Sequence, residues 1–366
     1  MVIRRLSLRL LGKMIKVFAD FHHADLFNSL RILFEERLGF ELYRPVGLDW
    51  YTEGYWNVFD ALDTAKQFLD LSIGDEWKEI QKKYPGAHFP AQNQNAVEVE
   101  SECFLIPDIT KDTFHRGITL DRFKDERFDI VLSSIPQHIP LYEKLISQYQ
   151  PQAKHIFQVG NAWGHQPGIK NILASTAPFP VPAGVNACFY HQEFDLNTFG
   201  YSVPNLDAPP QICSYIHYMQ RQDIFGQYAQ LLNEFQFKSF GAGMNSTIMK
   251  TADIAEQMKS SCFTWHYKPE GDGFGHIIHN TFAVGRPPIV WGSHYRGKLA
   301  ESLLIDGETC LDMERRSITE NIRMIRDASR PDNYLRMCES VRARFNAVVD
   351  YDKEEKDIRV FLDRLL

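Results

Sequence analysis

The chain has 366 residues, of which 44% are hydrophobic and 24% are charged, with a net charge of −7. This composition is typical of a folded protein of about two domains. The acidic balance argues weakly against a nucleic-acid or anionic-membrane partner, and no run of 18 apolar residues predicts a transmembrane helix. The six cysteines are scattered without a CxxC pair, which indicates reduced thiols in a cytoplasmic protein.

The first half of the chain begins with a basic, partly apolar stretch, MVIRRLSLRLLGK (1–13). We expect this stretch to be a flexible extension, with a short targeting or membrane-surface segment as the alternative. MIKVFADF (14–21) has the pattern of a strand, and apolar residues at helical spacing follow over 22–39. FELYRP is extended again, so strand, helix and strand begin a doubly wound sheet. We expect insertions over 46–110.

Alternation of strands and helices continues through the rest of the chain. FDIVLSSIP, KHIFQVGNA and KNILAST predict strands, and LYEKLISQY predicts a helix. Three prolines near the start of the segment 178–194 predict a pause in regular structure, and we expect a domain boundary there. Beyond it FKSFGAG, CFTWHYK, PPIVWG and ETCLDM predict strands, GKLAESLLI predicts a helix, and further helices close the chain. The pattern predicts two parallel-sheet α/β domains.

The turn KPEGDGFGH (268–276) places three glycines between a predicted strand and a predicted helix. A helix N-terminus favours an anion by roughly 0.3–1 kcal/mol when exposed and by ~2 kcal/mol when partly buried. Gly271, Gly273 and Gly275 lack a Cβ and allow close approach, and Lys268 adds a positive charge. The turn therefore predicts a diphosphate site, with a ligand-free structural turn as the alternative. Its spacing is not Gly-x-Gly-x-x-Gly and no Walker lysine follows, which disfavours a nicotinamide enzyme.

The segment PEGDGFGHIIHNTFAVGRPPIVWG (269–292) resembles the nucleotide-sugar segment of GT-B glycosyltransferases of the group 1 (family 4) type. Asp272 stands at the first acidic position of that pattern, and Asn280 stands eight residues later, where the family has a glutamate. VPAGVNACFYHQEF and YRGKLAESLLIDGETCLDM resemble the interdomain and downstream stretches of the same family. The family's diphosphate-holding arginine and lysine have no clear counterpart, and the chain offers Arg221 and His217 instead.

The resemblance implies an α/β fold of two Rossmann-like doubly wound domains facing a central cleft (GT-B). The implied parts are a flexible extension (1–13), an N-terminal acceptor-side domain (14–180), a C-terminal nucleotide-sugar-binding domain (181–348) and a terminal helix (349–366). That last helix is expected to pack back on the N-terminal domain. The implied donor-binding residues are Lys268, Gly271, Gly273, Phe274, Gly275, His276, Asn280, Arg221 and His217, with Asp272 as a catalytic residue facing the sugar.

The function that the resemblance implies is a hexosyl- or pentosyltransferase. It would move a sugar from a nucleotide-diphosphate sugar to a glycan or other hydroxyl acceptor, with retention, without a metal and without another cofactor. One alternative is a transferase acting on modified nucleic acid. Because Asn280 replaces glutamate, an inactive binding or scaffold protein is the other alternative. His276 and His279 lie three residues apart but have no evident third ligand, so we expect no metal site.

Candidate catalytic residues in the N-terminal half follow its first strand, in ADFHHADL. Asp20, His22 and His23 are expected at the carboxyl edge of the sheet, where ligands bind. A histidine or a carboxylate there can take the proton of an acceptor hydroxyl. Asp25 is better placed to cap the following helix.

Candidate acceptor contacts come from two other segments. Asn161 and His165 lie in GNAWGHQPG, which is expected to be a loop after a strand. Trp50 and Tyr55 belong to an aromatic-rich stretch that either stacks on sugar rings or forms a core or an oligomer contact.

Overall fold

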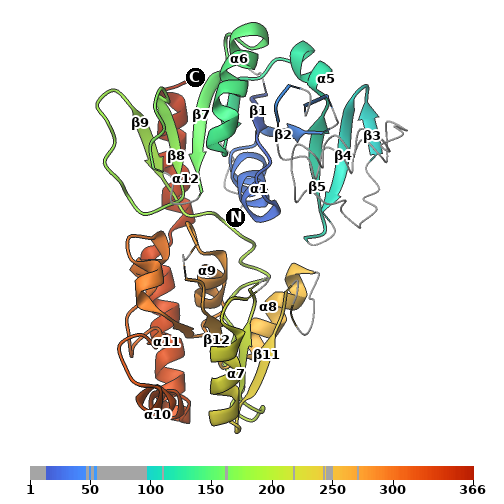
Figure 1. The fold of residues 1–366 in the computed structure, drawn as a ribbon. Helices are drawn as coiled ribbons and strands as arrows, with labels where there is room; N and C mark the ends of the chain where they lie inside the picture. The colour runs from blue at the N-terminus through green and yellow to red at the C-terminus, as the bar shows by residue number, and fades with distance from the viewer. Residues whose placement is uncertain are drawn as a thin grey trace, which may run out of the picture. The chain divides into compact units, whose positions relative to one another are not determined.

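The computed structural model describes residues 14–46, 49–50, 53–55, 97–108, 111–160, 164–216, 219–241, 244, 250–269 and 272–366. These residues form two compact units (Figure 1). The first contains the described residues up to Ala174 together with Pro180–Glu193 and Lys353–Leu366. The second contains Ser175–Phe179 and Phe194–Asp352. The expected extension, 1–13, lies outside the described residues.

The first unit is built on a sheet whose nine described strands follow the order β3-β4-β5-β2-β1-β6-β7-β8-β9. The strands are β1 (Lys16–Ala19), β2 (Glu41–Pro45), β3 (Val97–Glu100), β4 (Cys103–Asp108), β5 (Thr113–Ile118), β6 (Ile130–Ser133), β7 (Lys154–Val159), β8 (Asn171–Ala174) and β9 (Asn186–Phe189). Pairs from β5 to β9 are parallel, whereas β3 and β4 pair antiparallel with each other and β4 with β5. The antiparallel strands lie largely within the range in which we expected insertions.

Helices cover both faces of this sheet. They are α1 (Ala24–Arg31), η2 (Ile32–Arg37), α5 (Leu120–Asp125), η3 (Pro136–His138), α6 (Ile139–Tyr149) and the terminal α12 (Tyr351–Asp363). Side chains alternate between the faces of a strand, so Val17 and Ala19 join a core with α1 and α12, while Phe18 joins a core with α5 and α6. The helix that begins with α1 ends before Gly39, whose φ of +75° is the left-handed conformation that glycine adopts readily.

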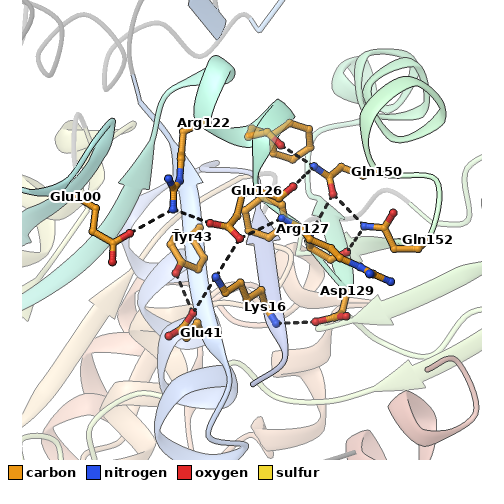
Figure 2. Close-up of polar contacts among 12 residues, drawn as sticks. Lys16, Glu41, Tyr43, Glu100, Arg122, Glu126, Arg127, Asp129, Gln150 and Gln152 are labelled. Atoms are coloured by element: carbon orange, nitrogen blue, oxygen red, sulfur yellow. Dashed lines mark hydrogen bonds and ion pairs between the residues drawn. The ribbon is translucent and has the colours of Figure 1, made fainter. Parts of the chain in front are cut away.

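A polar network closes the amino ends of β1 and β6 (Figure 2). Lys16 donates from Nζ to Glu126 Oε1 and from its backbone N to Asp129 Oδ2, both at 3.0 Å. Buried Gln150 donates to the carbonyls of Phe123 and Glu126 at 2.6 and 2.7 Å. The amino edge is thus held by the protein's own groups, and the candidate residues of this unit belong to the carboxyl edge, where ligands of parallel sheets bind.

The prediction of a pause over 178–194 is wrong in part, because β9 lies inside this segment. β9 pairs in parallel with β8 and forms the edge of the sheet. The three prolines all precede the strand, so none removes a backbone donor that the sheet needs.

The second unit has a parallel sheet of five described strands in the order β11-β10-β12-β13-β14. They are β10 (Gln211–Ser214), β11 (Gln236–Ser239), β12 (Phe263–His266), β13 (Pro288–Val290) and β14 (Leu311–Asp312). The helices are α7 (Gln222–Leu231), α8 (Thr251–Ser260), α9 (His276–Ala283), η4 (Gly292–Tyr295), η5 (Leu299–Leu303), α10 (Ile318–Ala328) and α11 (Pro331–Val348). Neighbouring residues such as Ile289 and Val290 join different cores, so both faces are covered.

The predicted α/β class is confirmed, and the second sheet is wholly parallel as expected. GKLAESLLI forms only a short 3₁₀ helix, η5, instead of the α-helix that we predicted. Within the described part of the chain, no helix is both long and apolar enough to cross a membrane.

Candidate functional site

The glycine-rich turn lies between the carboxyl end of β12 and the start of α9 (Figure 1). His266 ends the strand, Lys268 and Asp272 follow it, and Gly275 is the N-cap of the helix. Gly273 is among the described residues and is buried, whereas the predicted donor residue Gly271 lies outside them. The predicted strand, turn and helix are therefore present at the edge where parallel sheets bind ligands.

The start of α9 requires a glycine. Gly275 has a φ of +83° and provides no side-chain cap. A Cβ at this position would lie 3.3 Å from Ala300 Cβ, which is a tight contact. The first N–H groups of a helix have no partners within the helix, and they attract anions together with the helix dipole. The geometry suits a phosphate group.

Asp272 is held in its charged form. Burial by itself raises the pKa of Asp272, but His266 and Lys268 outweigh it and the pKa lies below its ordinary value. His266 is neutral near pH 7, since burial lowers its pKa to about 4. Lys268, whose Nζ contacts Asp272 Oδ1 directly, therefore provides the cation.

Phe274 supports the turn from within the core. Its side chain is 2% exposed and its ring lies parallel to the His279 ring, with 4.0 Å between centroids. His279 Nδ1 lies 3.0 Å from the Gly275 carbonyl, so it donates to the backbone of the helix start. We therefore correct the prediction that Phe274 contacts the donor, because its aromatic surface is already covered. His276 is half-buried at the first position of α9 and packs edge-on against Phe274.

Asn280 carries a hydrogen-bonding atom without a partner. The residue is 9% exposed, and its Oδ1 is buried and accepts no hydrogen bond from the described residues. An unsatisfied buried acceptor costs about 1–3 kcal/mol, so a group that donates to it would be favourable. Asn280 lies one turn beyond His276 in α9.

The other residues predicted to bind the donor, Arg221 and His217, contribute less to the site. Arg221 is exposed and already forms a two-bond contact with Asp223, at 2.9 and 3.0 Å. Arg221 is the N-cap of α7. Its φ of +55° is left-handed, a conformation that few non-glycine residues adopt. His217 lies outside the described residues.

In the first unit, Asp20 is a structural anchor. It is 1% exposed, and its carboxylate accepts from the Ser134 backbone N–H (3.1 Å) and the Tyr55 hydroxyl (3.1 Å). His138 Nδ1 also lies within 3.1 Å of it. We correct its assignment as a catalytic residue, because this carboxylate is enclosed by protein groups that join the loops after β1 and β6.

His23 is the N-cap of α1 and accepts from the Leu26 backbone N–H at 3.2 Å. This contact contradicts the cap predicted at Asp25, which instead pairs with Lys111. His23 is exposed and uses only Nδ1 for this contact, so its catalytic role stays a prediction. His22 is half-buried beside them. Burial lowers its pKa, Asp20 raises it and His138 lowers it, and the net shift is downward. His22 is therefore neutral near pH 7 and able to accept a proton.

Trp50 and Tyr55 belong to a core, which was the alternative to stacking on sugar rings. Trp50 is fully buried, donates from Nε1 to the Ile118 carbonyl at 3.0 Å, and stacks on Phe18. Tyr55 is 2% exposed and stacks on His138, with 4.4 Å between ring centroids. These rings form a core because both of their faces are covered.

The loop after β7 is only partly described. His165 Nε2 lies 3.1 Å from the Ile169 carbonyl, so it holds its own loop. Asn161 lies outside the described residues.

Sequence reasoning missed two residues that contact the turn or organise the first unit. His138 was not singled out, although it is the buried partner of Asp20. Tyr295, which contacts His266, is 29 positions away along the chain and carried no motif. Over the described ranges, no group of three or more histidine, cysteine, aspartate or glutamate residues is arranged to hold a metal.

Comparison of the sequence with protein-family models and with curated proteins gives no match. Solved structures do match. The Anabaena protein HepE, solved with UDP and with UDP-glucose, is 9% identical, with 96% of this chain and 100% of that chain covered and a TM-score of 0.58. An alpha-glucosyltransferase solved with UDP-glucose and DNA containing an abasic site is 10% identical, with 94% and 98% covered and a TM-score of 0.57.

Sucrose-phosphate synthase from Thermosynechococcus elongatus is 11% identical, with 96% of this chain and 99% of that chain covered and a TM-score of 0.56. At such identities a structural likeness establishes the fold and leaves the activity to be argued from the site. The chain therefore has the GT-B fold of these glycosyltransferases, as the sequence resemblance predicted.

Proposed function

We propose that this protein is a glycosyltransferase that moves a sugar from a nucleotide-diphosphate sugar to a hydroxyl acceptor. The observation that carries the proposal is the buried Oδ1 of Asn280, which has no partner among the described residues, in a helix that begins with an uncapped glycine. A nucleoside diphosphate supplies what these groups lack, because its hydroxyl groups donate hydrogen bonds and its phosphates accept them. The structural neighbours solved with UDP or UDP-glucose favour a UDP-sugar donor.

The proposed division of roles follows from charge. The diphosphate would lie at the N-terminus of α9, where backbone N–H groups and Lys268 neutralise it. This arrangement offers a transfer that needs no divalent cation, because the developing charge on the leaving diphosphate meets fixed positive groups. His276, at the first position of α9, would contact the diphosphate or the sugar.

Asp272 is the proposed catalytic carboxylate. An ionised carboxylate accepts hydrogen bonds only, so it can hold sugar hydroxyls, and it also favours positive charge that develops at the anomeric carbon. We propose transfer with retention, because Asp272 stands at the first acidic position of the retaining pattern that the segment resembles. Asn280 would accept from a ribose hydroxyl, with a weaker bond than the glutamate of that pattern because it lacks a charge.

On the acceptor side we propose His22, which is neutral near pH 7 and partly exposed. The acceptor would be a glycan or another hydroxyl compound. The neighbour solved with DNA supports testing nucleic acid as a second acceptor class. Binding of DNA through phosphates weakens steeply with salt, so a salt-independent affinity would exclude such recognition.

The test is a panel of UDP-, GDP- and ADP-sugars, with release of the nucleotide as the signal and thermal shift as the measure of binding. A ligand at 100 times its Kd stabilises by about 2.7 kcal/mol. We expect UDP-sugars to bind and to be hydrolysed slowly, and Asp272→Asn to bind UDP but lose nucleotide release. Binding without any turnover would favour the scaffold alternative, and no binding of any nucleotide would refute the donor site.

A further inference from the structure

A buried histidine stands directly behind the turn. His266 ends β12, is 1% exposed, and presents its two ring nitrogens to different partners. Nδ1 contacts the hydroxyl of Tyr295, and Nε2 lies 3.7 Å from Asp272 Oδ2. Tyr295 is itself fully buried at the end of η4. The three side chains form a continuous polar line from the core to the carboxylate.

The protonation states determine which of these side chains donates and which accepts. Burial lowers the pKa of His266 to about 4, so the ring is neutral near pH 7 and has one N–H and one lone pair. Burial raises the pKa of Tyr295 well above its ordinary value, so its hydroxyl keeps its proton. A lone pair on Nε2 would face the anionic Asp272, which is unfavourable. The arrangement therefore favours Tyr295 donating to Nδ1 and the proton of His266 lying on Nε2, directed at Asp272.

The two oxygens of Asp272 are held differently. Oδ1 contacts Lys268, whose side chain is 44% exposed, and Oδ2 faces His266, which is enclosed. A bound diphosphate would compete with Asp272 for Lys268, because phosphate oxygens attract the same ammonium group. His266 has no such competitor, since it is buried and fixed by Tyr295. It remains as the partner that orients the carboxylate.

We infer that His266, with its tautomer set by Tyr295, is a positioning residue that holds the Asp272 carboxylate toward the donor sugar through an electrostatic contact at Oδ2. The expected effect on turnover rests on the proposed function. The contact between His266 and Asp272 rests on geometry alone. The segment that resembles a known family begins after His266, so this role comes from the structure of this chain.

The experiment compares three variants. Tyr295→Phe removes the hydroxyl with little change in shape, and His266→Gln removes the ring. His155→Gln is the matched control, because His155 is also a largely buried histidine with a pKa of about 4 that bonds a hydroxyl, that of Ser133, in the other unit. Each variant is checked for fold by circular dichroism, for UDP affinity by calorimetry, and for kcat with the UDP-sugar that the wild type uses fastest.

We expect Tyr295→Phe and His266→Gln to lower kcat by about ten- to a hundredfold, the loss seen when a partner that orients a functional group is removed. The Kd for UDP should change by less than about threefold, because UDP lacks the transferred sugar that Asp272 is proposed to hold. His155→Gln should leave both unchanged. An unchanged kcat in folded Tyr295→Phe would overturn the orienting role while the proposed function stands.

A second measurement does not depend on turnover. Two-bond ¹H–¹⁵N correlation spectra identify which ring nitrogen of His266 carries the proton, with His266→Gln giving the assignment. We expect protonated Nε2 in the wild type, and a shifted His266 signal in both Tyr295→Phe and Asp272→Asn. An Nδ1 proton in the wild type, or a signal unmoved by Asp272→Asn, would overturn the inference. A wild type that turns over no nucleotide sugar would refute the proposed function and the sugar-directed role, and the spectra would still decide the contact.

Discussion

Lys268 and Asp272 form an ion pair across the turn that precedes α9, with Lys268 Nζ against Asp272 Oδ1. The same lysine helps to lower the pKa of Asp272, which burial alone would raise. A diphosphate at the N-terminus of α9 would draw on this lysine as well. In the proposed site one cation would therefore serve two anions, and the strength of the Lys268–Asp272 pair would limit the affinity for the diphosphate.

The first prediction concerns this lysine. Lys268→Ala should raise the Kd for UDP about tenfold at low salt, because it removes a charge-assisted bond that is partly screened at a 44% exposed side chain. The difference from wild type should shrink in 500 mM salt, as screening weakens the contact in the wild type. Calorimetry at two salt concentrations measures both effects.

Lys259→Ala is the control for Lys268→Ala. Lys259 pairs with Glu256 on α8, next to the amino end of β12, and so belongs to the opposite edge of the sheet. Its substitution should leave UDP binding unchanged. Equal affinities for Lys268→Ala and the control would show that the turn does not bind the diphosphate through this lysine.

Asn280 provides a second test in which stability and binding change in opposite directions. Asn280→Leu replaces an unsatisfied buried acceptor with an apolar side chain of similar size, so the melting temperature should stay the same or rise. UDP affinity should fall roughly fivefold, because a lost hydrogen bond is worth about 1 kcal/mol. Thermal melting with and without UDP measures both.

The matched control is Asn321→Leu in the same unit. Asn321 is 2% exposed, and its buried Oδ1 also has no partner among the described residues, but its Nδ2 donates to the Tyr228 hydroxyl and the Met313 carbonyl at 3.0 and 2.8 Å. Its loss should destabilise the protein without changing UDP affinity. If Asn280→Leu behaves like this control, Asn280 has a structural role and the proposed ribose contact is refuted.

Part of this site could be predicted from the sequence because its determinants are local. The glycines, the apolar spacing of α9 and the strand before them lie within about 25 residues, and local patterns fix such elements. The contact between His266 and Tyr295 joins two elements 29 residues apart, and no periodicity records which side chains meet there. Tertiary packing decided that contact.

The errors in the first unit have a similar origin. An aromatic run does not reveal whether water or other side chains cover its rings, and Trp50 and Tyr55 turned out to be covered. Histidine and aspartate both cap helices, and α1 begins two residues earlier than we predicted, so His23 is the N-cap. β9 follows prolines that usually mark loops, but it needed only one neighbour, β8, to form.

A third prediction tests the helix start with a pair of glycines. Gly275→Ala and Gly297→Ala both place a Cβ at positive φ, +83° and +70°, which costs roughly 1–2 kcal/mol. Only at Gly275 does the Cβ also crowd a neighbour, Ala300, at 3.3 Å, whereas the space at Gly297 is open. Gly275→Ala should therefore be the less stable of the two in urea. It alone should weaken UDP binding, and equal affinities would show that the helix start does not approach the ligand.

The last prediction concerns pH and His155. Burial lowers its pKa to about 4 from an ordinary 6.5, and unfolding returns it to the ordinary value. Between these two pH values the unfolded chain binds the extra proton, so stability rises with pH across this window and is lost as the pH falls from 6.5 toward 4. Each pH unit is worth about 1.4 kcal/mol, so the loss from this group between pH 6.5 and 5 is on the order of 2 kcal/mol.

The substitution His155→Gln isolates the contribution of this histidine to the pH dependence of stability. At pH 8 the variant differs from wild type mainly through the bond between His155 Nε2 and Ser133 Oγ, which is 2.8 Å in the wild type. The loss of this bond changes the free energy of unfolding equally at every pH. Proton uptake by His155 changes it only as the pH falls. Urea unfolding at pH 8, 6.5 and 5 should therefore show a smaller fall in the free energy of unfolding for the variant. Parallel curves for the two proteins would mean that His155 takes up its proton without unfolding.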